Sequence, residues 1–428
     1  MSELLFIEGG RVIDPAGGVD GVRTVVVRDG RIAEVAERVE RPREARVLDA
    51  RGRWVTPGFV DLHVHLREPG QEYKETVATG ARAAVAGGFT TVAAMANTNP
   101  VNDNASVTEL VLARAAAAGL ARVRPVGCVS RGQKGEELAE YGELKAAGCV
   151  ALSDDGRPVA SPALMRRALE YARAFDLPVA VHEEEPALAG KWAMHEGAAA
   201  TRMGLKGMPA QAESAMVWRD VELAELTGGR LHLQHLSTAG SVRALREAKR
   251  RGLRVTAEAA PHHLALTDED LARAGYDTSW KMNPPLRSAE DRRAVQEALA
   301  DGTIDCIATD HAPHSAVEKD LEFDAAANGI VGLETAFAVC LGLVRQGLLS
   351  ERRLIEALTA APARTFGLAA GSLAPGAPAD VAVLDPAAEW RVEPERFHSK
   401  GRHTPWKGAA LTGRCTHTLV DGRLVHGS

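Results

Sequence analysis

The order of hydrophobic and polar positions predicts strands and turns at both ends of the chain. In residues 1–55, apolar and polar side chains alternate in short runs between turn signals, without a helical period. Alternation with a period of two is typical of half-buried strands. The runs 24–28 and 31–35 flank Asp29-Gly30, a dipeptide that favours the positive φ of a hairpin turn. Residues 371–385 and 416–425 have the same character, so we predict that both termini join in one small β-domain.

Between these ends, short apolar stretches alternate with segments of helical period. Eight such stretches recur, at 59–65, 90–97, 122–129, 149–155, 178–183, 230–237, 254–260 and 304–310. Helical periods at 106–118, 161–175 and 238–251 separate several of them, and glycines stand where the helices should end. Repeated strand–helix units predict an α/β fold, a (β/α)₈ TIM barrel. A doubly wound open sheet is the alternative, but no glycine-rich nucleotide-binding motif follows any stretch.

These patterns divide the chain into two predicted domains. We expect the barrel to occupy residues 56–365 and the composite β-domain to be built from residues 1–55 and 366–428. In a barrel enzyme the active site lies at the carboxyl ends of the strands. The eight apolar stretches therefore indicate where candidate chemistry should be sought.

Composition and charge exclude several classes of protein. Hydrophobic residues make up 45% and charged residues 25% of the 428 residues, which is ordinary globular usage. No apolar run is long enough for a bilayer, and residues 1–10 lack the order of a signal peptide. The formal net charge is −6, from 51 Lys and Arg against 57 Asp and Glu, without a basic cluster, which argues against a nucleic-acid partner. We expect a cytoplasmic protein whose scattered cysteines are reduced core thiols: Cys128, Cys149, Cys306, Cys340 and Cys415.

Side chains that bind metals stand at the ends of five apolar stretches. The first stretch ends with His63 and His65, which lie two apart and so point to the same side of a strand. The fourth, fifth, sixth and eighth stretches end with Asp154-Asp155, His182, His235 and Asp310. Because buried imidazoles and carboxylates without partners are costly, their convergence at one rim of a barrel predicts a metal centre.

Some details of this centre stay open at the level of residue types. An isolated H-x-H is more often a pair of hydrogen-bonded core histidines than a metal site. Imidazole and carboxylate ligands without thiolate suit zinc, with manganese, cobalt and iron as alternatives. Either Asp154 or Asp155 has the charge to serve as a ligand. His232, three residues before His235, is expected to point to the opposite face of its strand.

Five motifs together resemble those of the dihydroorotases, in the bacterial type I branch of the cyclic-amidohydrolase superfamily. They are GFVDLHVHLREPG at 58–70, MANT at 95–98, SDDG at 153–156, KMNPPLR at 281–287 and TDHAPH at 309–314. The similarity runs from about residue 57 to residue 365, and the flanking β segments fit the small domain of the family.

The resemblance implies a set of metal ligands. One zinc ion would be held by His63, His65 and Asp310, and a second by His182 and His235, with Asp155 bridging the two. Two ions per subunit are implied, and a single ion is the alternative. The related hydantoinases and allantoinases bridge their metals with a carboxylated lysine on strand four, but the nearest lysine here, Lys145, belongs to the preceding helix. The interval to His182 in the family favours Asp155 over Asp154.

The resemblance also assigns residues to the substrate. Arg67, Asn97 and His314 would bind the ring carboxylate, and His65, Asn283, Asn328 and Gly329 would complete the site. Two plainer readings remain: Arg67 could pair with Glu68 or Glu72, and Asn97 could cap a turn.

This chain departs from the family pattern at three positions. Ala96 stands where the family commonly has Pro, Glu183 where it has Cys, and Asn328 where it has Phe. None of the three is an implied metal ligand, but the change at Asn328 puts the packing of the substrate loop in doubt.

The activity implied by the resemblance is the zinc-dependent, reversible hydrolysis of L-dihydroorotate to N-carbamoyl-L-aspartate in pyrimidine biosynthesis, with Asp310 moving the proton. A hydrolase of hydantoins or allantoin is the second hypothesis. The third is a structural partner of aspartate carbamoyltransferase, which the complete ligand set disfavours; a complex of the active enzyme with that transferase stays open.

A homodimer is the default expectation for a barrel of this size. Residues 312–332 form either a mobile lid or a static surface loop.

Overall fold

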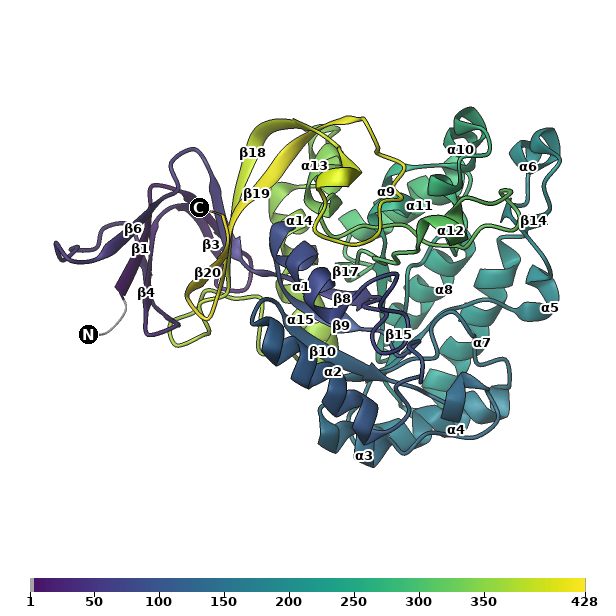
Figure 1. Ribbon diagram of the computed structural model, residues 1–428. Helices are drawn as coiled ribbons and strands as arrows, with labels where there is room; N and C mark the ends of the chain where they lie inside the picture. The colour runs from purple at the N-terminus through teal and green to yellow at the C-terminus, as the bar shows by residue number, and fades with distance from the viewer. Residues whose placement is uncertain (1–3, 428) are drawn as a thin grey trace.

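The computed structural model describes residues 4–427 and contains a barrel with a small β-domain beside it (Figure 1). Parallel strands form the barrel sheet in the order β17-β16-β15-β12-β11-β10-β9-β8. Their bounds are β8 (Phe59–Val64), β9 (Phe89–Ala94), β10 (Arg122–Gly127), β11 (Ala151–Leu152), β12 (Val179–Val181), β15 (Leu231–Leu233), β16 (Val255–Ala259) and β17 (Cys306–Ile307). The sheet closes where Val64 forms a parallel bridge with His311. The predicted (β/α)₈ fold is confirmed.

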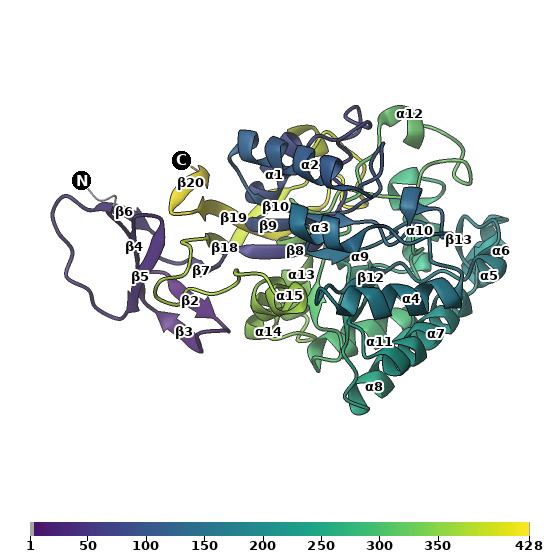
Figure 2. The same ribbon diagram turned by 90° about the horizontal axis from the view of Figure 1, so that it is seen from below.

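Helices cover the outside of the barrel (Figure 2). The helices between strands, and the one after β17, are α1 (Val77–Ala86), α2 (Ala105–Ala118), α3 (Tyr141–Ala147), α4 (Pro162–Arg173), α7 (Gln211–Thr227), α8 (Ala239–Arg250), α11 (Ala289–Ala300) and α13 (Ala336–Arg345). Capping interactions explain where these helices begin and end. The side chains of Ser161 and Thr238 accept hydrogen bonds from backbone N–H groups at the starts of α4 and α8. Gly119 ends α2 with a φ of 61°. The helical periods at 106–118, 161–175 and 238–251 therefore predicted α2, α4 and α8 closely.

Additional short elements extend the loops at the mouth of the barrel. They are η1 (Arg131–Gln133), α5 (Pro186–Ala189), β13 (Met194–His195), α6 (Ala198–Met203), β14 (Gly207–Met208), α9 (Pro261–Ala265), α10 (Asp268–Ala274), η2 (Thr278–Trp280) and α12 (Ala316–Lys319). At the other end of the barrel, α14 (Glu351–Leu358) is followed by α15 (Ala360–Phe366). Ala361, Ala363 and Phe366 of α15 pack against interior residues of the barrel strands, so α15 fills the amino ends of the strands.

The small domain joins both termini, as the alternating patterns predict. One sheet has the order β5-β4-β1-β6, and the other has the order β20-β19-β18-β7-β2-β3. Their strands are β1 (Leu4–Glu8), β2 (Arg11–Asp14), β3 (Val19–Val22), β4 (Thr24–Arg28), β5 (Arg31–Ala36), β6 (Arg46–Asp49), β7 (Trp54–Pro57), β18 (Val381–Arg391), β19 (Ala410–Val420) and β20 (Arg423–His426). The β4–β5 hairpin turns at Asp29 and Gly30, whose φ values are 49° and 77°. The limits at 55/56 and 365/366 stay a prediction.

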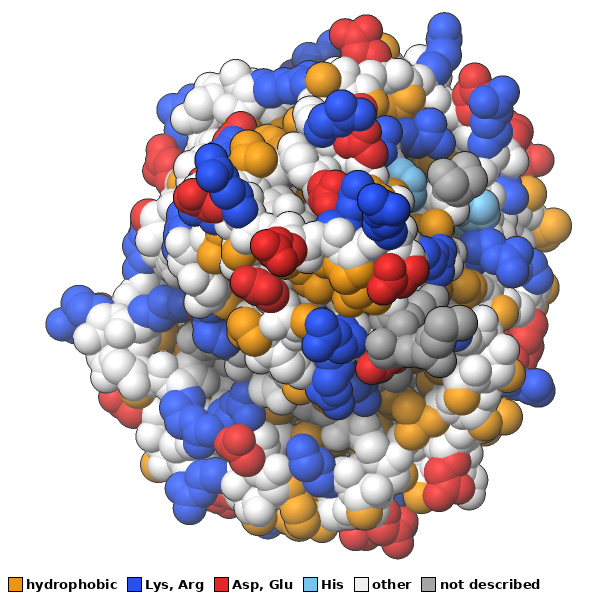
Figure 3. Space-filling model, turned by 90° about the vertical axis from the view of Figure 1, so that its left-hand side faces the viewer, with side chains coloured by type: hydrophobic (Ala, Val, Ile, Leu, Met, Phe, Trp, Pro, Cys, Tyr) orange, Lys and Arg blue, Asp and Glu red, His pale blue; other side chains and the backbone are white. Residues whose placement is uncertain are grey.

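A core of apolar side chains fills the space between the two sheets of the small domain. Ile7 and Val25 from the first sheet pack with Val55, Val381 and Leu419 from the second. Strands from opposite ends of the chain share this core, so neither terminal segment can fold into it alone. The outer face of this domain mixes side chains of both charges (Figure 3). Among the helices of residues 4–427, none is long and apolar enough to cross a membrane.

The two domains meet through aromatic side chains and one long hairpin. Phe59, in the first barrel strand, contacts Phe89 and Phe337 with ring centroids 5.4 and 6.0 Å apart. Phe337 also contacts Trp54 of β7 at 6.1 Å. The segment between β18 and β19, which includes η3 (Pro394–Arg396), continues over the barrel mouth, where Val331 N–H donates to the His403 carbonyl at 3.0 Å. The five cysteines are free and buried, as predicted.

We expect Phe59→Ala to destabilise the joint between the domains. Truncating a buried phenylalanine leaves a cavity and typically costs about 3–5 kcal/mol. Urea denaturation followed by circular dichroism should show that loss in the free energy of unfolding. Leu424→Ala is the control, because Leu424 is 40% exposed. A loss below about 1 kcal/mol for Phe59→Ala would contradict this account of the joint.

Candidate active site

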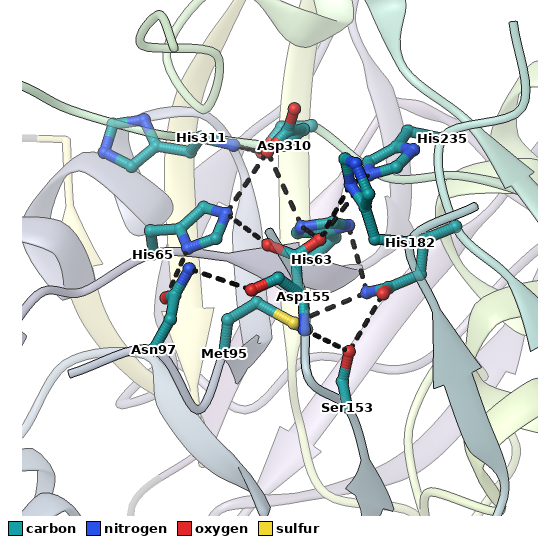
Figure 4. A network of polar contacts seen from close by, with 12 residues as sticks. His63, His65, Met95, Asn97, Ser153, Asp155, His182, His235, Asp310 and His311 are labelled. Atoms are coloured by element: carbon teal, nitrogen blue, oxygen red, sulfur yellow. Dashed lines mark hydrogen bonds and ion pairs between the residues drawn. The ribbon is translucent and has the colours of Figure 1, made fainter. Parts of the chain in front are cut away.

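The carboxyl ends of the barrel strands meet in a buried chamber that contains all six predicted metal ligands (Figure 4). They are His63 in β8, His65 just after it, Asp155 after β11, His182 after β12, His235 after β15 and Asp310 after β17. Their positions in the sequence span almost 250 residues, roughly the length of a whole barrel. The parallel order of the strands is therefore what brings them together.

Asp155 faces the histidines from both sides of the chamber. Its Oδ1 atom lies 3.5 Å from His63 Nε2, His182 Nδ1 and His235 Nε2. Its Oδ2 atom lies 3.3 Å from His65 Nε2. The carboxylate is therefore placed between His63 and His65 on one side and His182 and His235 on the other.

Asp310 completes the group around the first strand. Its Oδ1 atom lies 3.3 Å from His65 Nε2 and 3.5 Å from His63 Nε2. These separations exceed ordinary hydrogen bonds, but atoms that share one ion at 2.0–2.2 Å in a tetrahedron lie roughly 3.4 Å apart. His63 Nε2 and Asp155 Oδ1 are buried and form no hydrogen bond. The donor set and its spacing therefore fit a metal ion such as zinc.

The carboxylates keep their negative charge because the histidines are close. Burial alone would raise the pKa of Asp310, but the charge of His63 and the hydrogen bond from His65 lower it below its usual value. The pKa of Asp155 is likewise lowered by His63, His182 and His235 against the effect of burial. The chamber thus presents anionic oxygen atoms to a cation.

Asp154, the other aspartate of the SDDG motif, has a structural role. Its carboxylate accepts hydrogen bonds from the backbone N–H groups of Val129 and Ser130, at 2.8 and 3.1 Å for Oδ1. Ser130 Oγ also donates to it. Of the two aspartates, only Asp155 is directed at the histidines.

A second set of polar groups orients the histidine rings. Glu258 Oε1 lies 2.8 Å from Nδ1 of His63, and Asn97 Oδ1 lies 2.8 Å from Nδ1 of His65. Glu184 Oε2 lies 3.1 Å from Nε2 of His182. Each ring therefore uses one nitrogen for its neighbour and turns the other toward the chamber, as metal-binding histidines do.

The prediction for His232 is wrong. Its Nε2 atom lies 3.0 Å from Glu258 Oε2, and its ring packs against Phe366 inside the barrel. The alternation rule fails because β15 ends at Leu233 and the chain turns at His235, whose φ is 32°. His232 and His235 thus both face the interior, one below the other.

Seven predicted substrate-binding residues line a cavity of about 220 Å³ above the metal ligands. They are His65, Arg67, Asn97, Asn283, His314, Asn328 and Gly329. A larger cavity, of about 530 Å³, opens at the amino ends of the strands beside Arg230 and Arg353. Its size does not make it the active site, because the predicted metal ligands line the smaller cavity.

Arg67 is placed to face an anion in this cavity. It is buried, and Nε donates to the Pro313 carbonyl at 3.2 Å. It pairs with neither Glu68 nor Glu72, which bind the backbone N–H groups of Val77 and Gly70 instead. Burial lowers the pKa of its guanidinium. An anionic ligand would offset the cost of this buried charge.

The remaining cavity residues present polar atoms from several loops. Asn97 does not cap a turn, because Oδ1 is bound to His65 and Nδ2 reaches the Asp155 carbonyl only at 3.5 Å. Asn283 Nδ2 donates to Glu184 at 2.8 Å, while its Oδ1 is buried without a hydrogen bond. The Asn328 carbonyl accepts from His314 Nε2 at 2.8 Å.

Comparisons with known proteins agree with this geometry. A family model described as dihydro-orotase-like matches residues 52–241. A dihydroorotase of Anaeromyxobacter dehalogenans is 79% identical over 426 residues, covering 100% of this chain and 98% of the relative. A dihydroorotase of Geotalea daltonii is 54% identical over 422 residues, covering 99% of both chains. The chain belongs to the dihydroorotase family.

Solved structures extend the similarity to the wider group of cyclic amidohydrolases. The L-hydantoinase (dihydropyrimidinase) of Arthrobacter aurescens superimposes with a TM-score of 0.88 at 25% identity, over 99% of this chain and 96% of the hydantoinase. The chain is therefore a cyclic amidohydrolase enzyme, and its dihydroorotase-type residues lie on a shared fold.

The structure adds residues to this dihydroorotase site that sequence reasoning missed. Glu258 is a charged residue within a predicted apolar strand, a signal that was available in the sequence. A second group, beside Asp310, has no such signal: Glu75 Oε2 accepts from Ser399 Oγ at 2.5 Å and lies 3.3 Å from His311 Nε2. Ser399 belongs to the segment between β18 and β19, so the C-terminal hairpin supports the chamber.

We expect Glu258→Gln to weaken zinc binding by about 10–100-fold, because the loss of an outer carboxylate usually has that effect. Burial would raise the pKa of Glu258, but hydrogen bonds with His232 and His63 lower it to about 2, so the residue is a carboxylate. Zinc affinity can be measured by competition with a chromophoric chelator. Glu247→Gln, on the exposed side of α8, is the matched control, and equal affinities for both variants would contradict the role of Glu258.

Proposed function

We propose that this chamber catalyses the reversible hydrolysis of L-dihydroorotate to N-carbamoyl-L-aspartate with zinc, as a step of pyrimidine biosynthesis. The observation that carries the proposal is the position of Asp155, whose two oxygen atoms face histidines on both sides. Relatives named dihydroorotase at 79% and 54% identity support the reaction. The buried guanidinium of Arg67 in the same cavity supports an anionic substrate.

Two zinc ions per chain fit the donor set better than one. His63, His65 and Asp310 would hold one ion, and His182 and His235 the other, with Asp155 between them. When bound, zinc polarises a carbonyl oxygen and makes water acidic near neutral pH. The zinc titration of the unmodified chain distinguishes two ions from one by its stoichiometry.

The substrate would be held by its carboxylate and its ring. Arg67, His314 and Asn97 would bind the carboxylate, for which a planar guanidinium is well suited. Asn283, Asn328 and Gly329 would contact the ring, and His65, itself a proposed metal ligand, lines the same cavity. Burial and the charge of Arg67 lower the pKa of His314 to about 3, so the ring is a neutral imidazole whose one N–H, on Nε2, donates to the Asn328 carbonyl.

Asp310 would move the proton. In hydrolysis, the oxygen of water forms a bond to the ring carbonyl carbon, and the bond from that carbon to the ring nitrogen breaks. Asp310 takes a proton from the attacking water and delivers it to the departing nitrogen. In the reverse reaction Asp310 takes the proton from the carbamoyl nitrogen, and water leaves as the ring closes.

A hydrolase of hydantoins is the second candidate, because the hydantoinases share the fold. The strand-four position that faces the histidines is an aspartate here, and the cavity holds Arg67 for a carboxylate that hydantoin and dihydrouracil lack. We therefore favour dihydroorotate.

The assembly and location of the enzyme are also proposals. A homodimer is the expected state for a barrel enzyme of this size. An active enzyme of this kind can also form a complex with aspartate carbamoyltransferase, whose product is N-carbamoyl-L-aspartate. The absence of thiol pairs, with five buried free cysteines, supports a cytoplasmic location.

Asp310→Asn should lower kcat for dihydroorotate by about 10²–10⁴-fold, since the amide cannot accept the proton. The KM should change by only about threefold, because binding of the carboxylate is left in place. Steady-state kinetics followed by ultraviolet absorbance, or by a colorimetric assay for carbamoyl groups, measure both constants. The control is Asp301→Asn, an exposed position at the far end of the barrel. Near-normal kcat in zinc-loaded Asp310→Asn would remove this residue from the mechanism.

Arg67→Met should raise KM for dihydroorotate by about 10–100-fold, the usual effect of losing a hydrogen bond to a charged group. Turnover of dihydrouracil, which has no carboxylate, should stay low and change little. Comparing both substrates with the unmodified enzyme and with Arg114→Met, an exposed control, tests the choice of substrate. An unmodified enzyme that prefers hydantoin or dihydrouracil would overturn the proposed function.

A further inference from the structure

Two lysines are buried beside the substrate cavity without an ion-pair partner. Lys319, at the end of α12, is 1% exposed, and Lys281, the first residue of the KMNPPLR motif, is 4% exposed. Among residues 4–427, no carboxylate oxygen lies within ion-pair distance of either ammonium group. A buried charge of this kind is costly unless other groups satisfy it.

Backbone carbonyls satisfy Lys319. Its Nζ donates to the carbonyls of Ala327 and Gly329, both at 2.9 Å, and to that of Lys281 at 3.3 Å. An ammonium group has three N–H donors and no acceptor. Three carbonyls therefore use its full donor capacity.

Lys281 holds the preceding part of the same loop. Its Nζ donates to the carbonyls of Asp324 and Ala326, at 2.9 and 2.7 Å, and lies 5.7 Å from the ring centre of Phe323. The carbonyl of Lys281 accepts from Gly329 N–H at 3.0 Å. The two lysines thus bind carbonyls of the same stretch of backbone, residues 324–329.

This turn is the wall of the substrate cavity. Asn328 and Gly329 line the cavity, and so does Asn283, two residues after Lys281. Gly329 has a φ of 135°, and a Cβ there would lie 2.7 Å from the Ala312 carbonyl oxygen, so this stretch has little room to shift. Replacing either lysine would therefore alter the positions of the Asn328 and Gly329 atoms that line the cavity.

We propose that Lys281 and Lys319 are positioning residues, whose ammonium groups hold the backbone carbonyls of residues 324–329 so that Asn328 and Gly329 form a fixed wall for the substrate. The proposal rests on the proposed function for the identity of the substrate. Under this proposal residues 324–329, which belong to the 312–332 segment, form a static loop and not a mobile lid.

Burial makes the charge of Lys319 costly, and the hydrogen bonds of its Nζ to three carbonyls offset that cost. Burial and the neighbouring charge of Lys281 lower the pKa of Lys319 to about 7, while Asp277 acts in the opposite direction. An amine at this position is thus held where its charge is costly. The carbonyl contacts give a physical reason for placing it there.

The test compares Lys319→Met, which removes all three donors, with Lys319→Gln, which keeps a side-chain amide. Lys281→Met tests the second lysine, and Lys407→Met is the control, because the Lys407 side chain is 67% exposed. Each variant is loaded with zinc and assayed with dihydroorotate. Hydrogen exchange of the backbone amides in residues 320–332 is measured by mass spectrometry on the same samples.

We expect KM to rise by about tenfold or more in Lys319→Met and Lys281→Met, with kcat within about threefold, and by less in Lys319→Gln. Exchange should become faster in residues 324–329, and zinc content should stay unchanged. Unchanged KM and unchanged exchange in folded variants would overturn the proposal. So would a lower melting temperature with normal KM, because it would indicate a structural role only. Hydrogen exchange can be measured without turnover. An unmodified enzyme that is inactive on dihydroorotate would therefore contradict the proposed function, whereas unchanged exchange in the lysine variants would contradict the positioning role.

Discussion

The structure depends on one interaction: the attraction between buried imidazoles and two buried carboxylates at the rim of the barrel. Asp155 and Asp310 lie within 3.5 Å of ring nitrogens from strands that are far apart in sequence. Removed from water, neither the carboxylates nor the rings would be stable without such neighbours. The same arrangement makes the chamber a site for cations, since its free nitrogen and oxygen atoms point at a common space. The arrangement that stabilises these buried side chains is therefore the same one that could bind a metal ion.

The hydrogen bonds behind the ligands explain how the geometry is kept. Glu258 joins His63 to His232, and Asn97 joins His65 to the cavity wall. His235 and Asp310 have φ values of 32° and 48°, which non-glycine residues rarely adopt. Such conformations persist only where the surroundings hold them, and they are common at functional sites. The rim is thus shaped by its outer contacts as much as by its strands.

The small domain contributes to this support and is not a separate appendage. The segment between β18 and β19 crosses from the sheet of the small domain to the barrel mouth, where Ser399 binds Glu75 next to His311. Glu334 accepts from the backbone of residues 398 and 399 and anchors the same crossing. The loop that carries Asp310 is therefore buttressed by residues from the C-terminal part of the chain.

Local patterns in the sequence were enough to predict the fold and to place candidate metal ligands at the strand ends. The helical periods, the Asp29-Gly30 turn and the polar ends of the apolar stretches are short-range signals, and a closed parallel barrel forces such strand ends together. Candidate ligands could be proposed because they stand at or just after the ends of the apolar stretches, and the family resemblance selected the set of six. Charge alone could not distinguish Asp154 from Asp155, because both are carboxylates. They differ in the direction of their side chains, which only the folded structure shows.

What only the tertiary structure decided concerns contacts between distant segments. The alternation rule misplaced His232 because it does not include the turn that begins after Leu233. The Ser399–Glu75–His311 group and the binding of residues 324–329 by Lys281 and Lys319 involve partners that carry no common pattern. By itself the sequence determined which residues end each strand, because that depends on neighbours along the chain. The tertiary structure decided where those residues point and what supports them, because that depends on packing between segments that only folding brings into contact.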